Sequence, residues 1–238
     1  MVNAIATAVR FAGLGAALFA LVRETFGLRA PGTLPIARLV RRELGARVPV
    51  GQLVICLAAG VLLVATPVAW SIALGDAELS ADSGWQGAAI LAVVATVGVK
   101  VLWVFFEELA FRAALITVVS RRLPVAVAVV ISAIAFAAAH GRDAAAAAIL
   151  FVDGVGFGVA YVATRSLRPP IAFHLGKNLA VWLFTGQSTM QFAALPWRLS
   201  GATTNSAVDL GFGVLVVSLA SLLLLRRQVN QLDQTVLS

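Results

Sequence analysis

The sequence predicts an all-α protein, a polytopic transmembrane helix bundle of six to seven spans, and its composition and the pattern of its apolar runs carry that prediction. Of the 238 residues, 61% are hydrophobic and only 12% are charged, and the mean hydropathy is +0.96. Soluble domains average about 25% charged residues. The apolar residues also gather in several runs that approach or exceed the roughly 20 residues needed to cross a bilayer as a helix.

The charged residues exclude some other classes of protein. Lys and Arg outnumber Asp and Glu by 18 to 11, but the cations lie in short segments between apolar runs. This is the pattern of topology determinants, so we expect no nucleic-acid partner. Cys56 is the sole cysteine, which rules out an intrachain disulfide and a cysteine-based metal cluster. Only two histidines, His140 and His174, are present for any imidazole chemistry.

Residues 1–86 are expected to form an N-terminal membrane region. The apolar stretch 1–22 is interrupted by Arg10, and we expect a retained first helix there, with a signal-like or interfacial segment as the alternatives. The Arg-rich loop 23–47 is expected to be cytoplasmic. Residues 50–74 are long and apolar enough to span, with a kink at Pro67.

Residues 87–186 are expected to form a core of about four helices, and residues 187–238 an outer loop, a last span and a cytoplasmic tail. The core begins after an acidic outer loop at 75–84. Pro169 and Pro170 are expected to break the helix that precedes the last apolar run of the core. Trp197 is expected to anchor the second outer loop at the membrane interface. The apolar runs of the core and the last span are 87–120, 124–140, 144–163, 171–184 and 207–225.

An unusual cluster of charges closes the first run of the core, where the chain reads FFEELAFR. A charge in the middle of a membrane span costs roughly 2.5 to 3.5 kcal/mol on insertion scales. On a helix, Glu108 and Arg112 are spaced to form an ion pair on one face, whereas Glu107 is turned about 100° away. The sequence therefore indicates one structural carboxylate and one that is free for chemistry, or else a charge cluster that only fixes helix packing.

Each histidine has a polar or aromatic residue one helical turn away in the sequence. His140 ends the stretch FAAAH, and His174 begins HLGKN, in which Asn178 lies one helical turn further along. Glu107 and His140 are each about 16 residues from the turn near Leu123, which predicts that they lie at one level of the bundle. The same count leaves His174 nearer the cytoplasm, unless tilt, a helix break or a re-entrant segment brings it back.

Other polar or small residues of the core are expected to have structural roles. Gly154, Gly156 and Gly158 favour close helix packing over a phosphate loop, because no strand precedes them. Asp153 is expected to be a packing contact. Lys177 is expected to extend toward the membrane interface, with binding of a substrate carboxylate as the alternative. Lys100 lies two turns before Glu107 on the same helix face.

The three motifs EELAFR, FAAAH and HLGKN, in this order, resemble the signatures EExxxR, FxxxH and HxxxN of the CAAX prenyl protease and bacteriocin-processing family, the type II CAAX endopeptidase-like intramembrane proteases. The resemblance covers about residues 87–186. It implies that the four-helix core is catalytic, with Glu107 as base and His140 assisting it. It further implies an oxyanion site at His174 and Asn178, with the site held in shape by Glu108 and Arg112.

The resemblance leaves the metal question open, because members of this family have often been named metalloproteases. Glu107, His140 and His174 could bind zinc, but HxxxN is not the HExxH arrangement. A metal-free glutamate mechanism without a cofactor is therefore favoured.

The expected partners are membrane lipid and a hydrophobic or lipidated peptide, and the expected location is a multi-pass protein of the bacterial plasma membrane. Two other functions stay open: a non-catalytic immunity or scaffold protein that binds peptides, and a proton-coupled transporter, since embedded Glu and His also form proton relays.

Overall fold

The computed structural model describes residues 44–45, 47–81, 90–140, 143–185, 197–201 and 211–222. Helices make up most of this part of the chain, as the composition predicts. The expected first helix at 1–22, most of the Arg-rich loop and the tail at 228–238 lie outside the described residues.

Three helical stretches are long and apolar enough to cross a membrane. They are α3 (Val50–Ala73), the continuous stretch Ile90–Val119 and α7 (Ala144–Thr164), while α6 (Val125–Ala139) and the helix Gly211–Leu222 are apolar but shorter. The second stretch consists of α4 (Ile90–Glu108), the π-helical segment η1 (Leu109–Ile116) and α5 (Thr117–Val119). The protein is thus an integral membrane protein by its helices, whereas the number of six to seven spans remains a prediction.

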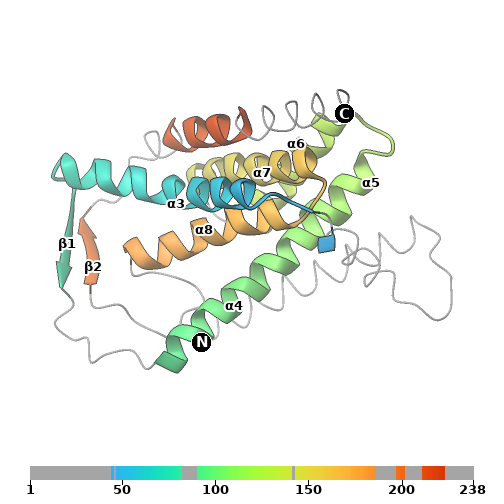
Figure 1. The fold of residues 1–238 in the computed structure, drawn as a ribbon. Helices are drawn as coiled ribbons and strands as arrows, with labels where there is room; N and C mark the ends of the chain where they lie inside the picture. The colour runs from blue at the N-terminus through green and yellow to red at the C-terminus, as the bar shows by residue number, and fades with distance from the viewer. Residues whose placement is uncertain are drawn as a thin grey trace.

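Two short strands are an exception to the all-helical expectation. β1 (Ala77–Ala81) and β2 (Trp197–Gly201) pair antiparallel, with Ala77 opposite Gly201 and Ala81 opposite Trp197. They come from the two segments predicted to be outer loops, and the sheet lies at one end of α3 (Figure 1). Hydrogen bonding between these segments gives their backbone groups partners that an isolated loop would lack.

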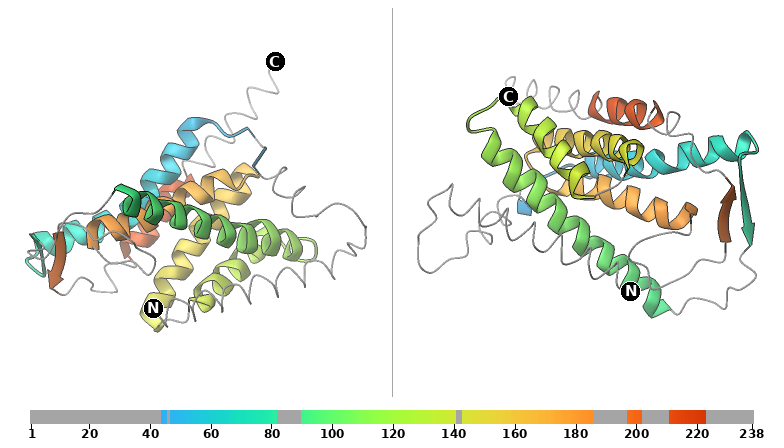
Figure 2. Two further views of the ribbon diagram at one scale, coloured as in Figure 1. Left: turned by 90° about the horizontal axis from the view of Figure 1, so that it is seen from below. Right: turned by 180° about the vertical axis from the view of Figure 1, so that it is seen from behind.

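The helices pack as a bundle in which α3 and α8 (Arg168–Thr185) run side by side and α4 crosses them obliquely (Figures 1 and 2). Aromatic rings fill the centre, where Phe157 contacts Phe136 at 6.0 Å and Phe173 at 5.1 Å between ring centroids. All three rings are at most 1% exposed. Phe136 and Phe157 of this aromatic core contact His174 and Arg112, two of the polar residues described below.

The junction between α7 and α8 differs from the expected proline break. α7 begins at the N-cap Asp143, whose side chain accepts a hydrogen bond from the amide of Ala146 at 3.0 Å, and it ends at Arg165 with a φ of 49°. The left-handed residue ends the helix. Pro169 and Pro170 lie in the first turn of α8, where a missing amide hydrogen costs nothing. The prolines therefore begin a helix instead of breaking one.

Glycines allow the closest contacts between helices. A Cβ on Gly60 of α3 would lie 2.0 Å from the carbonyl oxygen of Phe173, and one on Gly176 of α8 would lie 2.4 Å from that of Leu57. The predicted close packing of α7 is also present, because a Cβ on Gly154 would lie 2.9 Å from the Cα of Ala133. Backbone contact of this kind is how small residues hold membrane helices together.

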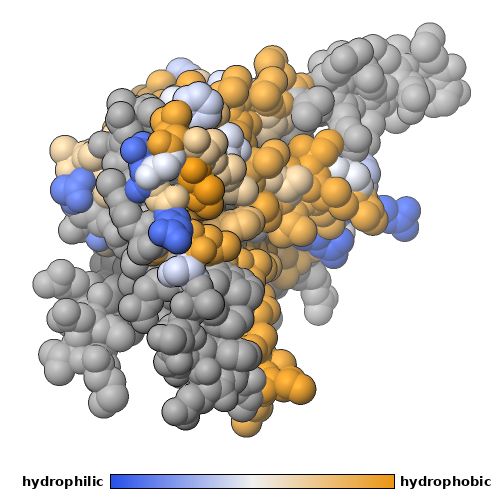
Figure 3. Space-filling view, turned by 90° about the vertical axis from the view of Figure 1, so that its left-hand side faces the viewer, coloured by the Kyte–Doolittle hydropathy of each residue, from blue (hydrophilic) through white to orange (hydrophobic). Residues whose placement is uncertain are grey.

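The outer surface is strongly apolar. Large apolar side chains are exposed along α3 and α4, among them Val50 at 73%, Ile90 at 82% and Phe106 at 61%. Figure 3 shows such side chains gathered over a broad area of one face of the molecule. A surface of this extent is expected where a protein faces lipid.

We predict that Gly60→Val weakens the bundle, because even the first added carbon would clash with the backbone of α8. The free energy of unfolding in detergent should fall by about 1 to 3 kcal/mol or more, as for overpacked cores. Gly98→Ala is the matched control, since a Cβ there meets nothing within 4 Å. Equal stability of the Gly60 variant and the wild type would contradict the packing described.

Candidate active site

Two adjacent glutamates lie at the end of α4, where the chain changes from α-helix to the π-helical segment η1. Glu107 is 5% exposed, and Glu108 and Arg112 are completely buried. Segments of π-helix are rare and frequently occur at functional sites. Ser132 of α6 supports this one, because its hydroxyl donates a hydrogen bond of 2.8 Å to the carbonyl of Phe111.

Glu108 links two of the three sequence motifs. Its Oε2 lies 3.2 Å from Nε of Arg112, which is the ion pair that the spacing predicts. Its other oxygen, Oε1, lies 2.8 Å from Nδ1 of His174 on α8. One buried carboxylate therefore ties η1 to α8, which the sequence did not indicate.

Arg112 is held by more than its carboxylate partner. Its Nη2 donates to the carbonyl of Gly154 on α7 at 3.3 Å, and its guanidinium lies over the rings of Phe136 and Phe157 at 4.6 and 5.1 Å from their centroids. Contacts of a cation with aromatic faces are worth about 2 kcal/mol when desolvated. They stabilise this charge in the interior of the bundle.

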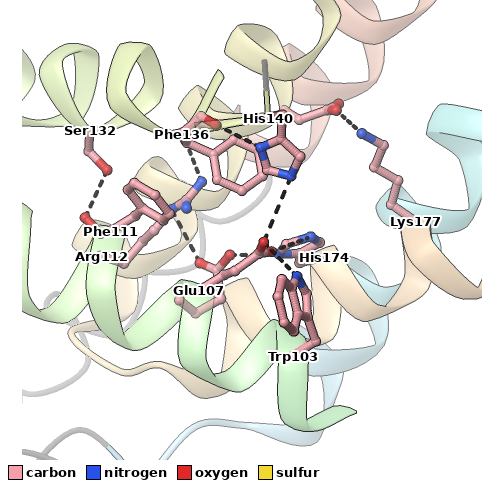
Figure 4. A network of polar contacts seen from close by, with 12 residues as sticks. Trp103, Glu107, Phe111, Arg112, Ser132, Phe136, His140, His174 and Lys177 are labelled. Atoms are coloured by element: carbon pink, nitrogen blue, oxygen red, sulfur yellow. Dashed lines mark hydrogen bonds and ion pairs between the residues drawn. The ribbon is translucent and has the colours of Figure 1, made fainter. Parts of the chain in front are cut away.

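Glu107 faces both histidines (Figure 4). Its Oε1 lies 3.8 Å from Nε2 of His140, and its Oε2 lies 3.5 Å from Nε2 of His174. The prediction that Glu107 and His140 lie at one level is confirmed. His174 also reaches this level, as expected if tilt offsets the residue count, because α4 crosses α8 obliquely and the two side chains lie 3.5 Å apart (Figure 1).

A tryptophan that the sequence analysis missed also holds Glu107. The indole N–H of Trp103 donates a hydrogen bond of 2.7 Å to Oε1 of Glu107. The two residues are four apart on α4, so helical spacing alone was a signal for this contact. The hydrogen bond fixes the direction in which the carboxylate points.

Both imidazole rings are oriented by an acceptor at Nδ1. Nδ1 of His174 faces the carboxylate of Glu108. Nδ1 of His140 lies 2.8 Å from the carbonyl oxygen of Phe136, which is one of the last carbonyls of α6. Because these acceptors favour a proton on Nδ1, the neutral rings present the Nε2 lone pair to Glu107. Phe157 stacks on His174 at 4.7 Å and 15°, which further fixes that ring.

The distances around Glu107 suit a bridging water. Separations of 3.5 and 3.8 Å are longer than a direct hydrogen bond, yet a water beside each pair can reach both atoms. Asn178, half-buried on α8, lies one helical turn beyond His174, about 6 Å along the axis. The structure therefore brings together Glu107, Glu108, Arg112, His140 and His174, with Asn178 on the adjoining turn.

The model of the type II CAAX prenyl endopeptidase Rce1-like family matches residues 82–180, which include all three motifs. Over residues 82–180 the chain is similar to the Rce1-like family. The match covers less than half of the chain, and α3 lies outside it. No curated protein matches the chain. The family is one of endopeptidases, so the match supports a peptidase at the level of this family.

Glu107, His140 and His174 are the residues that the sequence offers for zinc. Among the residues that the structure describes, no group of three or more His, Cys, Asp or Glu side chains has the arrangement of a metal site. That Glu107, His140 and His174 work without a metal stays a prediction, which treatment with a chelator tests.

Lys177 differs from its predicted role. Its ammonium forms an ion pair with Asp153 of α7 and does not extend to the membrane interface. The side chains of Lys177 and Asp153 are 16% and 1% exposed. A buried carboxylate is a more favourable partner for this ammonium than a distant interface, because an unpaired Asp153 would be costly in this setting. Lys100 is also buried, at 6% exposed.

We predict that Glu108→Gln lowers the free energy of unfolding of the Rce1-like region by about 3 to 5 kcal/mol, because Arg112 would lose its compensating charge. Chemical unfolding in detergent measures the change. The double variant Glu108→Gln, Arg112→Met should be less destabilised than the single one, since it removes both charges. A single variant as stable as the wild type would contradict this account of Glu108.

Proposed function

We propose that this protein is an intramembrane endopeptidase that hydrolyses a peptide bond of a membrane-associated peptide with a water activated by Glu107 and His140. One observation carries the proposal: the Nε2 atoms of both histidines face the two oxygens of a single buried carboxylate. A carboxylate and an imidazole within reach of one water are the groups that general acid–base hydrolysis needs.

Glu107 acts as the base. It takes a proton from the water while the water oxygen attacks the carbonyl carbon of the substrate, and Nε2 of His140 accepts a hydrogen bond from the same water. The proton then passes to the departing amide nitrogen as the C–N bond breaks, which releases a carboxylic acid and an amine. The remaining proton of the acid then moves to the amine, so that the products are a carboxylate and an ammonium. Trp103 supports this role, because its hydrogen bond keeps Oε1 directed toward His140.

His174 and Asn178 stabilise the oxyanion of the tetrahedral intermediate. The amide of Asn178 is a donor, and removing one such donor costs about 2.7 to 4 kcal/mol of transition-state stabilisation in a comparable hydrolase. His174 donates from Nε2 only when both ring nitrogens carry protons. In that form its Nδ1–H donates to Glu108, so Glu108 and Arg112 keep the ring in place.

The substrate class follows from the setting of the site. Glu107, Glu108 and His174 are nearly inaccessible from water, and the outer surface is apolar. A hydrophobic or lipidated peptide reaches such a site from the membrane more easily than a soluble peptide does. We place the protein in a bacterial plasma membrane as a multi-pass protein, with its Arg-rich loops and C-terminus in the cytoplasm.

We predict that Glu107→Gln abolishes cleavage of a prenylated or hydrophobic peptide by the purified protein in detergent. Rates should fall by about 10²- to 10⁴-fold, the usual contribution of general acid–base catalysis. The neutral amide cannot take the proton, although it has almost the same shape. Asp76→Asn, which removes an exposed carboxylate, is the control and should leave the rate unchanged.

Full activity in the Glu107 variant would overturn the proposed mechanism. Activity should also survive treatment with a chelator, whereas loss on chelation and recovery with zinc would favour a metal mechanism instead. An immunity or scaffold protein would bind the peptide and leave it intact. A transporter would instead move protons across vesicles.

Trp103→Phe tests the direction of the carboxylate. The variant keeps an aromatic ring but loses the N–H that holds Oε1 of Glu107. A hydrogen bond to a charged group is worth about 1.5 to 3 kcal/mol, so we predict a fall in kcat of roughly 10- to 100-fold with little change in KM. Steady-state cleavage kinetics measure both. An unchanged kcat would show that the indole does not orient the base.

A further inference from the structure

The ion pair of Asp153 and Lys177 has no part in the mechanism above, yet it lies within one turn of residues that do. Lys177 follows His174 by three residues on α8 and directly precedes Asn178. Figure 4 shows Lys177 next to the polar network of the site. The partner, Asp153, comes from α7 and is almost completely buried.

Gly154, the residue after Asp153 on α7, makes a second connection to the site. The carbonyl of Gly154 accepts the hydrogen bond from Arg112, and its Cα packs against Ala133 of α6. The consecutive residues Asp153 and Gly154 thereby contact α8, η1 and α6. Of these elements, α8 carries His174, η1 carries Arg112 and directly follows the glutamate pair at the end of α4, and α6 ends directly before His140.

Helix α8 therefore has two fixed contacts on the side of the site. His174 is held by Glu108, and Lys177, about one turn later, is held by Asp153. The backbone contacts of Gly60 and Gly176 already hold α8 against α3, and the two polar contacts add attachments to Glu108 at the end of α4 and to Asp153 on α7. Two contacts one turn apart oppose rotation and sliding of α8. Asn178 directly follows Lys177 in the chain, so the second contact also holds Asn178 in place.

We propose that Asp153 and Lys177 are positioning residues for hydrolysis, and that their ion pair holds α8 in the register that presents His174 and Asn178 to the peptide bond. This inference depends on the proposed function. A misplacement of about 1 Å far from the reacting atoms can cost roughly 100-fold in rate, so a lost register is expected to appear in kcat.

The test compares Asp153→Asn, Lys177→Gln and the double variant, in full-length protein in detergent, with kcat expressed per folded molecule. Each single variant leaves one buried charge without its partner and should lower kcat by roughly 100-fold, with KM changed by less than about threefold. The double variant, whose two amides can hydrogen-bond to each other, should recover to within about tenfold of the wild type.

Two matched controls remove a charge of the same kind from the same helices. Asp143→Asn changes the exposed N-cap of α7 to another good capping residue, and Arg168→Gln removes an exposed cation at the start of α8. Both should keep the wild-type kcat. If the ion pair only stabilises the fold, the single variants will yield less folded protein but retain kcat per folded molecule, which would overturn the proposal.

Hydrogen exchange supplies a measurement that needs no activity. Amides of residues 174–178 should exchange faster in Asp153→Asn than in Asp143→Asn, because α8 has lost its second contact. Equal protection would overturn the proposal whether or not the protein cleaves a peptide. A wild type without peptidase activity but with the expected change in exchange would instead refute the proposed function and leave the register contact standing.

Discussion

The structure of the site depends on one constraint, which is that a fully buried carboxylate needs a partner for each oxygen. Glu108 meets it with an ion pair to Arg112 on one side and a hydrogen bond from His174 on the other. Burying such a charge without partners would cost several kcal/mol. Satisfying it brings η1 and α8 together, and that contact places the Nε2 atom of His174 opposite Glu107. Glu107 therefore faces the two imidazoles. Their nitrogens lie 3.8 and 3.5 Å from its oxygens, farther than Arg112 lies from Glu108.

Much of this arrangement could be predicted from the sequence, because it depends on local spacing. The ion pair between Glu108 and Arg112 is an interaction within one turn of helix, and the shared level of Glu107 and His140 follows from equal chain lengths on the two sides of a turn. The close packing of the α7 glycines could be predicted from the small residues themselves, although their partners, such as Ala133 for Gly154, lie on other helices. The roles of these residues in catalysis, by contrast, remain predictions that only activity measurements test.

Contacts between distant segments could not be predicted in this way. Counting residues treats the helices as parallel, whereas α4 crosses α8 obliquely and thereby brings Glu107 beside His174 (Figure 1). Asp153 and Lys177 are 24 residues apart in sequence, and their pairing follows from how α7 and α8 pack together. The change to π-helix after Glu108 and the pairing of the two strands also have no clear local signal.

The contact of Gly60 and Gly176 bears on how a bulky chain reaches the buried carboxylates from the lipid. Where two backbones touch, separating the helices would forfeit many dispersion contacts at once, so the seam between α3 and α8 is a poor place for a lateral opening. α4 exposes large apolar side chains, among them Ile90 at 82% and Phe106 at 61%, and carries Glu107, which is buried. A peptide that enters beside α4 would therefore meet the helix that holds the base.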